Sequence, residues 1–424
     1  MISIFDIVAG LLTLTALFAW ANHRYLHLPN NVGLLVMGLA ASLVLVGLEI
    51  SIPGVALFGD LENFIEKINF SETLLEGMLA FLLFAGALQI DLTLLRDRAW
   101  TVGAMATLGV IISTVIVAIL MWGAGQLLSL PMPFTWALVF GALISPTDPI
   151  AVLAVLKQAR VAKTLEMDMA GESLFNDGVG VVLFTILLSA AMTSSGDSGI
   201  DFVEIGRLFF IEALGGALLG LITGYIAYLA MRSIDDYPIE VLISLGLVTG
   251  TYALAGPLEV SGPIAVVTAG VLTGNRGAAF AMSDQTKRYL FDFWSLIDEM
   301  LNSILFLLIG LEVLVVQFDV SLLPLAAAAI PIVLIARFIS ITLPMAFIRF
   351  TQRFVKGTIP ILTWGGVRGG ISVALALSIP AVTERPQILA ATYAVVLFTL
   401  IVQGLTLPAV VRRFAIPRPA PTES

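Results

Sequence analysis

The sequence predicts an all-α polytopic membrane protein with about 13 transmembrane helices, on the strength of three observations. Of its 424 residues, 59% are hydrophobic and 12% are charged, whereas a soluble globular chain has about 25% charged residues. The mean hydropathy is +1.02. Apolar runs of about 18 residues or more, the length that a helix needs to cross a bilayer, recur along nearly the whole chain.

Apolar segments between polar, glycine or proline breaks define thirteen predicted spans. The longer ones must tilt or extend beyond the bilayer at their ends. A short cytoplasmic tail, 412–424, is expected to follow the last span. The predicted spans cover residues 2–21, 31–49, 72–90, 101–128, 134–156, 168–192, 205–231, 238–255, 259–275, 299–316, 323–348, 358–380 and 388–411.

The distribution of basic residues predicts the orientation, because cytoplasmic loops of membrane proteins are rich in Lys and Arg. With the N-terminus outside, 16 of the 21 Lys and Arg residues lie inside, three lie outside, and Arg337 and Arg368 fall within spans. We therefore expect an outer N-terminus, a cytoplasmic C-terminus and an odd number of crossings. The short tails and the lack of a regulatory domain are typical of a bacterial inner membrane protein.

Two spans contain residues that interrupt a helix. The fifth contains SPTDP (residues 145–149), whose two prolines remove two N–H donors from the helix interior. The carbonyl groups of Ala142 and Ser145 then need other partners in lipid, and a cation is one candidate. The twelfth contains GGVRGG (residues 365–370), in which four glycines around an arginine favour a non-helical backbone.

The positions of the two interrupted spans predict an internal repeat. Span twelve follows span five by seven, so the breaks are equivalent if spans 1–6 and 8–13 are repeats joined by span 7. Because the offset is odd, the repeats are inverted in the membrane, which is typical of secondary transporters with a midplane site. The expected parts are a first repeat at 1–192, a linker helix at 193–236 and a second repeat at 237–411.

The two discontinuous helices are expected to cross, which brings four half-helix ends together. Half-helix N-termini carry partial positive charge and C-termini carry partial negative charge. Asp148 can balance the N-termini, and Arg368 can balance the C-termini. An ionisable residue at membrane depth is costly and usually faces a polar interior, so both residues point to function.

The sixth span begins with the polar motif GESLFND. Ser173 and Asp177, four residues apart, share one helix face, and Glu172 and Asn176 share the neighbouring face. An unpaired carboxylate at this depth takes up a proton unless a cation is near, so a proton and a metal cation are expected to compete for Asp177. Glu172 is expected to pair with Arg337 of span eleven, as a buried ion pair that fixes helix positions.

GESLFND, SPTDP, an arginine in span eleven and GGVRGG occur together along nearly the whole chain. In these motifs the sequence resembles sodium/proton antiporters of the cation:proton antiporter-1 family. The resemblance implies a homodimer in which a core domain moves against a dimerisation domain. It implies that Asp177 binds the cation and the proton, with Asn176 beside it, and that Ser173, Thr147 and Asp148 line or support the site. On this interpretation, Na⁺ lies at Asp177, Ser173 and Thr147.

Members of this family can place a polar or ionisable group near the pathway in span three. Here the segment FLLFAGALQID has no acid at mid-span, and Glu76 lies a turn or two before it. Glu76 is retained as a candidate pathway residue. No cofactor is expected, and the expected partners are Na⁺, Li⁺, H⁺, membrane lipid and a second copy of the chain, with K⁺ left open.

The charges of the predicted site favour electroneutral exchange. The empty site has a net charge of −1, from Asp148, Glu172 and Asp177 against Arg337 and Arg368. One Na⁺ or one H⁺ makes it neutral, and a bare charge is costly to carry across a low-dielectric barrier. We therefore expect alternating access, with one Na⁺ exchanged for one H⁺.

Other function classes fit the sequence less well. Oxygen ligands suit hard cations, which favours Na⁺ and Li⁺ and makes a K⁺/H⁺ antiporter the nearest alternative. A passive channel does not require paired broken helices. An enzyme is not expected, because the chain has no cysteine and its two histidines, His23 and His27, leave a metalloprotease without ligands. An aspartyl protease built on Asp148 and Asp177 would leave the prolines and the repeat without a role. The net charge of −9 comes from acidic outer loops and indicates no nucleic-acid partner.

Overall fold

The computed structural model describes residues 4–51, 71, 73–159, 161–193, 202–312, 319–349, 352 and 354–414, and this part of the chain is helical throughout, with short connections. The predicted all-α class is thereby confirmed. The longer helices are α1 (Ile4–Ala21), α2 (Asn30–Ser51), α5 (Leu79–Leu88), α8 (Val110–Leu127), α9 (Phe134–Ile144), α10 (Ile150–Gln158), α11 (Lys163–Thr193), α12 (Phe202–Arg232), α13 (Tyr237–Ala255), α14 (Gly262–Leu272), α16 (Asp284–Glu312), α17 (Leu323–Ile348), α18 (Thr358–Trp364), α19 (Gly370–Leu377), α20 (Arg385–Phe398) and α21 (Gly404–Phe414).

Within the described residues, each of the thirteen predicted spans overlaps one helix or a run of adjoining helices. Spans five and twelve are divided, into α9 and α10 and into α18 and α19. Seven of the described helical segments are long and apolar enough to cross a membrane by themselves. A bent pair, Val8–Leu26 and Asn30–Leu45, meets the same criterion with an angle of 106° between its halves. The halves of the divided spans are too short to meet it alone.

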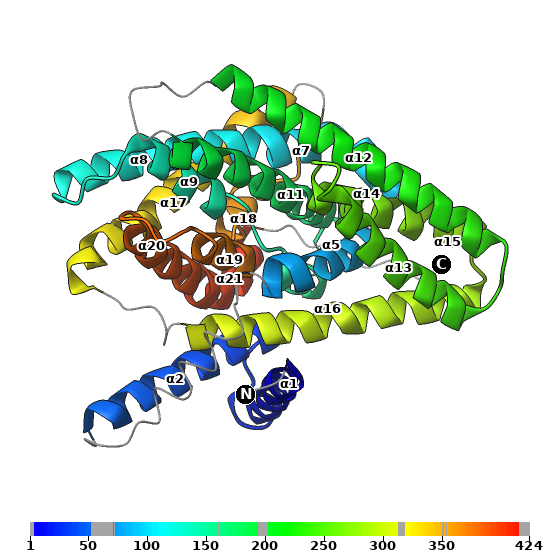
Figure 1. Cartoon of the computed structure of the whole chain (residues 1–424), viewed down its shortest axis with the longest axis horizontal. Helices are drawn as coiled ribbons and strands as arrows, with labels where there is room; N and C mark the ends of the chain where they lie inside the picture. The colour runs from blue at the N-terminus through cyan, green and yellow to red at the C-terminus, as the bar shows by residue number, and fades with distance from the viewer. Residues whose placement is uncertain are drawn as a thin grey trace.

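The longest departure from the predicted boundaries is at α16, which begins at Asp284 rather than at 299. Its first half carries Asp284, Lys287, Arg288 and Asp292, so hydropathy detects only the apolar second half. Figure 1 shows α16 crossing the lower part of the molecule, with α1 and α2 on one side and α5, α9 and α19 on the other. This helix packs against α2, α5, α13 and α19 and therefore connects the N-terminal helices to the broken helices.

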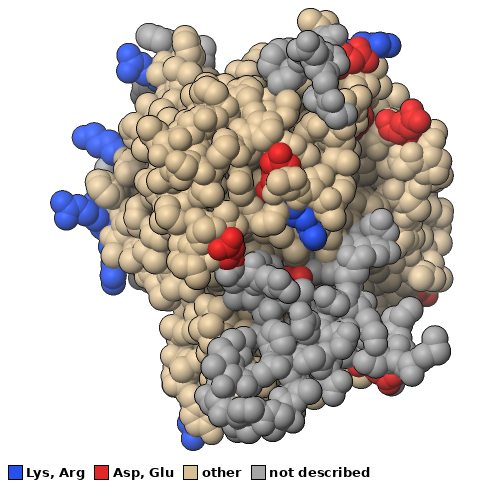
Figure 2. All heavy atoms as spheres, turned by 60° about the vertical axis from the view of Figure 1, so that its left-hand side comes forward, with Lys and Arg blue, Asp and Glu red and all other residues tan. Residues whose placement is uncertain are grey.

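The surface is largely apolar, as a protein surrounded by lipid requires. In the described part of the face in Figure 2, uncharged residues cover most of the area, and most of the visible Lys and Arg lie along the left-hand margin. On α12, large apolar side chains stand outward, with Phe210 64% exposed and Leu214 67% exposed. Such a helix is stable only where lipid or another apolar surface covers these side chains.

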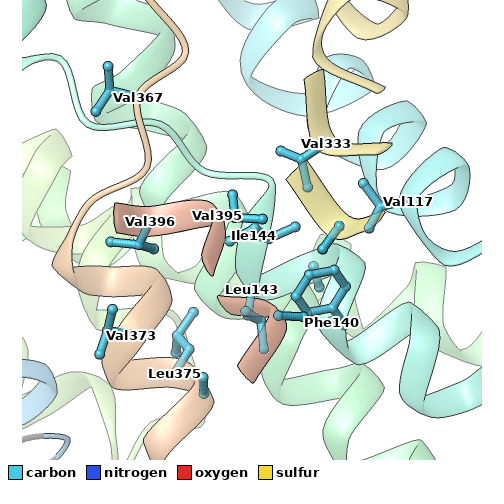
Figure 3. Close-up of a cluster of buried hydrophobic side chains, with 14 of the residues drawn as sticks. Val117, Phe140, Leu143, Ile144, Val333, Val367, Val373, Leu375, Val395 and Val396 are labelled. Atoms are coloured by element: carbon cyan, nitrogen blue, oxygen red, sulfur yellow. The ribbon is translucent and has the colours of Figure 1, made fainter. Parts of the chain in front are cut away.

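The interior packs around the broken helices. The first half-helix α9 is buried along its length between α8, α11 and α20. Figure 3 shows the apolar cluster that holds it against α8, α17, α19 and α20, and the labelled members are Val117, Phe140, Leu143, Ile144, Val333, Val367, Val373, Leu375, Val395 and Val396. Because this cluster includes Val367 of the second break, apolar packing fixes the two interrupted helices in one position.

Candidate functional site

The first break lies between α9 and α10, where Pro146 and Pro149 lack the N–H groups that would continue the helix. The carbonyl of Ala142 accepts a hydrogen bond from Ser145 N at 3.4 Å. The carbonyls of Ser145 and Pro146 both accept from Nη1 of Arg368, at 2.8 Å for Pro146. An arginine of the second break therefore takes the place that sequence reasoning left open for a cation.

The second break lies between α18 and α19, and its glycines serve close approach rather than unusual torsion angles. Gly365 has a φ of −77° and Gly369 a φ of −110°, both accessible to other residues. A Cβ on Gly366 would lie 2.5 Å from Arg337 Nε, and one on Gly369 would lie 2.7 Å from Asp148 Oδ2. The backbone at 366–369 is non-helical, as predicted, and the glycines of GGVRGG also let it pass directly over two charged side chains.

The two breaks are bound to each other. Asp148 N donates to the carbonyl of Val367 at 2.8 Å, a backbone hydrogen bond between the interrupted segments. The Asp148 carboxylate lies beside Gly369, immediately before the N-terminus of α19. Arg368 is completely buried, and its backbone N–H donates to Thr399 Oγ1 at 3.1 Å. Asp148 therefore faces a positive helix end, while Arg368 binds the negative end of α9.

The GESLFND motif, residues 171–177 of α11, packs against the first break. Asn176 Nδ2 donates to Thr147 Oγ1 at 2.9 Å, and Asn176 Oδ1 accepts from Thr147 N at 3.3 Å. The hydroxyl groups of Thr147 and Ser173 lie 3.0 Å apart. All three side chains are buried to 1% exposure or less. The Asn176 side chain thus accepts from the Thr147 N–H, which a continuous helix would bond to its own backbone. It thereby holds the non-helical segment in place.

Close contact between α11 and the break requires a glycine at position 180. A Cβ there would lie 2.2 Å from Cγ of Pro146, closer than any real packing contact. We expect Gly180→Ala to lower the free energy of unfolding by about 1–3 kcal/mol, because the break must move away. Gly250→Ala in α13 is the matched control, since no described atom comes within 4 Å of its Cβ; it should be neutral or stabilising by up to about 1 kcal/mol. Unfolding in mixed micelles measures the free energy of unfolding of both variants. Equal changes in the two variants would show that the contact with Pro146 does not require a glycine at position 180.

Glu172 and Arg337 form an ion pair beside the second break. The two nitrogens Nη1 and Nη2 of Arg337 donate to the two carboxylate oxygens of Glu172, with Nη2 at 3.1 Å. Arg337 Nε and Nη2 also donate to the carbonyl of Leu362, in the last turn of α18, at 3.3 and 3.2 Å. Glu172 is 1% exposed and Arg337 is 4% exposed. Arg337 therefore binds the C-terminal end of α18 in the way that Arg368 binds that of α9.

A cavity of about 580 Å³ reaches the breaks, and Thr147, Asp148 and Asp177 line it. Asp177 is 9% exposed, and it makes no hydrogen bond or ion pair with the described residues. Of the other predicted ligands, Ser173 and Asn176 lie behind Thr147 and do not form the cavity wall. A buried carboxylate without such a partner must hold either a proton or a cation, because the isolated charge is too costly.

Sequence reasoning missed two polar residues of this cavity, Asp298 and Asn302 of α16. Their spacing of four residues places them on one helix face, which could have indicated a shared role. The predicted start of span ten at 299 separated them, because Asp298 fell outside the span and Asn302 inside it. Sequence reasoning also missed the buried ion pair between Arg98 and Asp168. The backbone at Glu76 lies in a π-helical turn, Thr73–Met78, and its side chain is outside the described part of the structure.

Comparison with known proteins identifies relatives over almost the whole chain. A family model described as "Sodium/hydrogen exchanger, transmembrane" matches residues 12–413. The Na⁺/H⁺ antiporter NhaP of Pseudomonas aeruginosa is 43% identical over 419 residues, which cover 98% of each chain. The Na⁺/H⁺ antiporter NhaH of Halobacillus aidingensis is 37% identical over 380 residues, covering 89% of this chain and 92% of that protein.

Among solved structures, the sodium proton antiporter MjNhaP1 from Methanocaldococcus jannaschii at pH 8 has a similar fold. The TM-score is 0.73, and the match covers 96% of this chain and 98% of that one. The sequence identity is 20%, so this similarity concerns the fold alone. It agrees with the all-helical architecture described above.

Proposed function

The chain belongs to the sodium/hydrogen exchanger family, and we propose that it exchanges Na⁺ or Li⁺ for H⁺ at Asp177. The observation that carries this proposal is the position of Asp177, buried on the wall of a cavity with no hydrogen bond or ion pair to the described residues. A carboxylate in this setting binds one positive charge at a time, so a proton and a cation exclude each other. The similarity to Na⁺/H⁺ antiporters of 43% and 37% identity supports this choice of ions.

In this proposal the Na⁺ ligands are oxygens of Asp177 and Thr147, and Ser173, which was predicted as a third ligand, supports Thr147 from behind the cavity wall. Thr147 lies on the cavity with Asp177, and the Ser173 hydroxyl is 3.0 Å from that of Thr147. Asn176 acts as a positioning residue, because both ends of its amide are bonded to Thr147. An all-oxygen set of this kind suits hard cations.

The exchange is proposed to be electroneutral with one Na⁺ for one H⁺. The charged residues of the predicted site are Asp148, Glu172, Asp177, Arg337 and Arg368, with a net charge of −1 when the site is empty. Either cation brings this set to zero, and a neutral site crosses a low-dielectric barrier at the lowest cost. The uncharged amide of Asn176 adds nothing to the sum.

The proposed transport cycle is alternating access. The lining of the cavity includes Asp91, Lys157, Lys163 and Glu166, and the predicted topology assigns their segments to the cytoplasmic side. The cavity is then the inward-facing entrance in a bacterial inner membrane. We propose that inverted repeats at 1–192 and 237–411 carry the two broken helices, and that this core moves against a dimerisation domain in a homodimer.

The test is transport by the purified full chain in liposomes that enclose a pH-sensitive dye. After an acid-inside gradient is imposed, external Na⁺ and Li⁺ should dissipate it, with external K⁺ and choline as comparisons. The rate should not change when valinomycin and K⁺ gradients set the membrane potential, because no net charge moves. Dissipation by K⁺ alone would overturn the choice of Na⁺ and Li⁺ in favour of a K⁺/H⁺ antiporter. A rate that follows the membrane potential would overturn the 1:1 stoichiometry.

A further inference from the structure

The cavity that leads to Asp177 has an excess of acidic side chains. Asp91, Asp148, Glu166, Asp177 and Asp298 line it, against Lys157 and Lys163. Low-dielectric walls focus the field of such a set and raise the local concentration of cations. These groups differ in exposure: Asp91 and the two lysines are exposed, Asp148, Glu166 and Asp298 are half-buried, and Asp177 is buried.

Asp298 is fixed on the cavity wall by its own helix. Asn302 Nδ2 donates to Asp298 Oδ1 at 2.9 Å and to the carbonyl of Asp298 at 2.8 Å. Asn302 is 2% exposed and also lines the cavity, so this amide is a buried support for the half-buried carboxylate above it. Asp298 forms no ion pair within the described residues.

The charge environment separates Asp298 from Asp148. Asp148 lies beside the N-terminus of α19 and so faces a partial positive charge. Asp298 sits in the middle of α16, away from both ends of that helix, and lines the same cavity as Asp148. A cation held between two carboxylates offsets the repulsion of their like charges. Asp177 is the most buried acidic residue of the same cavity, and it has no hydrogen-bond or ion-pair partner among the described residues.

We infer that Asp298, held by Asn302, forms a cation entry site in which hydrated Na⁺ pauses before it reaches Asp177. This inference rests on the proposed function, because it assigns a route to the same exchange site. The entry site lowers the Na⁺ concentration needed for exchange and takes no part in proton exchange itself. It lies on α16, outside the two broken helices and outside the GESLFND motif.

The test compares Asp298→Asn with wild type in the liposome assay over a range of Na⁺ concentrations. We expect the apparent KM for Na⁺ to rise about fivefold with an unchanged maximal rate, the size expected for one charge acting across a partly aqueous cavity. The difference should shrink when choline chloride is added, because ions screen a charge that water reaches. Asp298→Glu, which keeps the charge, should keep the KM of wild type.

Glu299→Gln is the matched control, because Glu299 is the neighbouring carboxylate on α16 but is exposed and does not line the cavity. It should leave the KM unchanged. An equal rise in KM in both variants, an unchanged KM in Asp298→Asn, or a loss of maximal rate and thermal stability alone would each overturn the entry site. Asp177→Asn is measured in parallel: if it still exchanges, the proposed function fails, whereas wild-type kinetics in Asp298→Asn beside an inactive Asp177→Asn refute the entry site alone.

Discussion

Asp177→Asn should reduce Na⁺-driven dissipation of a pH gradient to the level of protein-free liposomes. The asparagine side chain keeps the size of the aspartate but neither gains nor loses a proton and carries no charge for a cation. It therefore resembles the protonated site permanently. The fold should survive, because the substitution removes the charge of a residue that is only 9% exposed and has no hydrogen-bond or ion-pair partner among the described residues. We expect an unfolding temperature equal to or above that of wild type.

Binding measurements separate loss of the site from loss of movement. Na⁺ at a hundredfold excess over its Kd should stabilise the wild-type protein by about 2.7 kcal/mol, and the variant should show no such gain. Asp292→Asn is the matched control, because it makes the same chemical change at an exposed position of α16 that does not line the cavity. Exchange that persists in Asp177→Asn would show that this carboxylate is structural and that ions bind elsewhere.

Much of the fold follows from hydropathy and from helix-breaking residues. The thirteen apolar segments all correspond to helices, because lipid forces every backbone group in a span to be bonded within its own segment. The breaks at 145–149 and 365–370 could also be predicted from the sequence, because prolines and clustered glycines are unfavourable in a continuous helix. The start of α16 could not, because its first half is polar on one face and a search for apolar runs excludes it.

The sequence shows which residue types occur at the site, but it does not show which groups they bond. The sequence indicated that the Ser145 carbonyl would lose its donor, yet a cation and a side chain were equally suitable replacements. Only the packing of α19 against α9 assigns that carbonyl to Arg368, 223 positions away. Asp298 was missed for a related reason, since the cavity that makes it relevant exists only once α16 lies beside the breaks.

Two of the buried arginines, Arg337 and Arg368, perform the same task at the two breaks. Arg368 donates to the carbonyls that follow α9, and Arg337 donates to a carbonyl in the last turn of α18. Each C-terminus carries partial negative charge that lipid cannot solvate. The difference lies in the counter-charge, because Arg337 has the carboxylate of Glu172 whereas Nε and Nη2 of Arg368 make no hydrogen bond to the described residues.

Removal of either member of the Glu172–Arg337 pair should destabilise the protein more than Gly180→Ala or any of the single substitutions at the cavity. Glu172→Gln leaves the buried guanidinium without a counter-charge, and Arg337→Met leaves both the carboxylate and the Leu362 carbonyl without a donor. Breaking a buried pair in this way costs about 3–5 kcal/mol. The free energy of unfolding, measured in mixed micelles of SDS and a mild detergent, reports the loss.

A double variant distinguishes a paired role from two independent ones. Glu172→Leu with Arg337→Met removes both charges together, so its cost should be well below the sum of the single substitutions. The exposed pair of Glu204 and Arg207, whose side chains are 48% and 67% exposed, supplies the control: Glu204→Gln should cost no more than about 1 kcal/mol. Additive costs at the buried pair would mean that the two residues act separately. If unfolding is unchanged in Glu172→Gln while exchange is lost, Glu172 belongs to the transport pathway and the structural role is wrong.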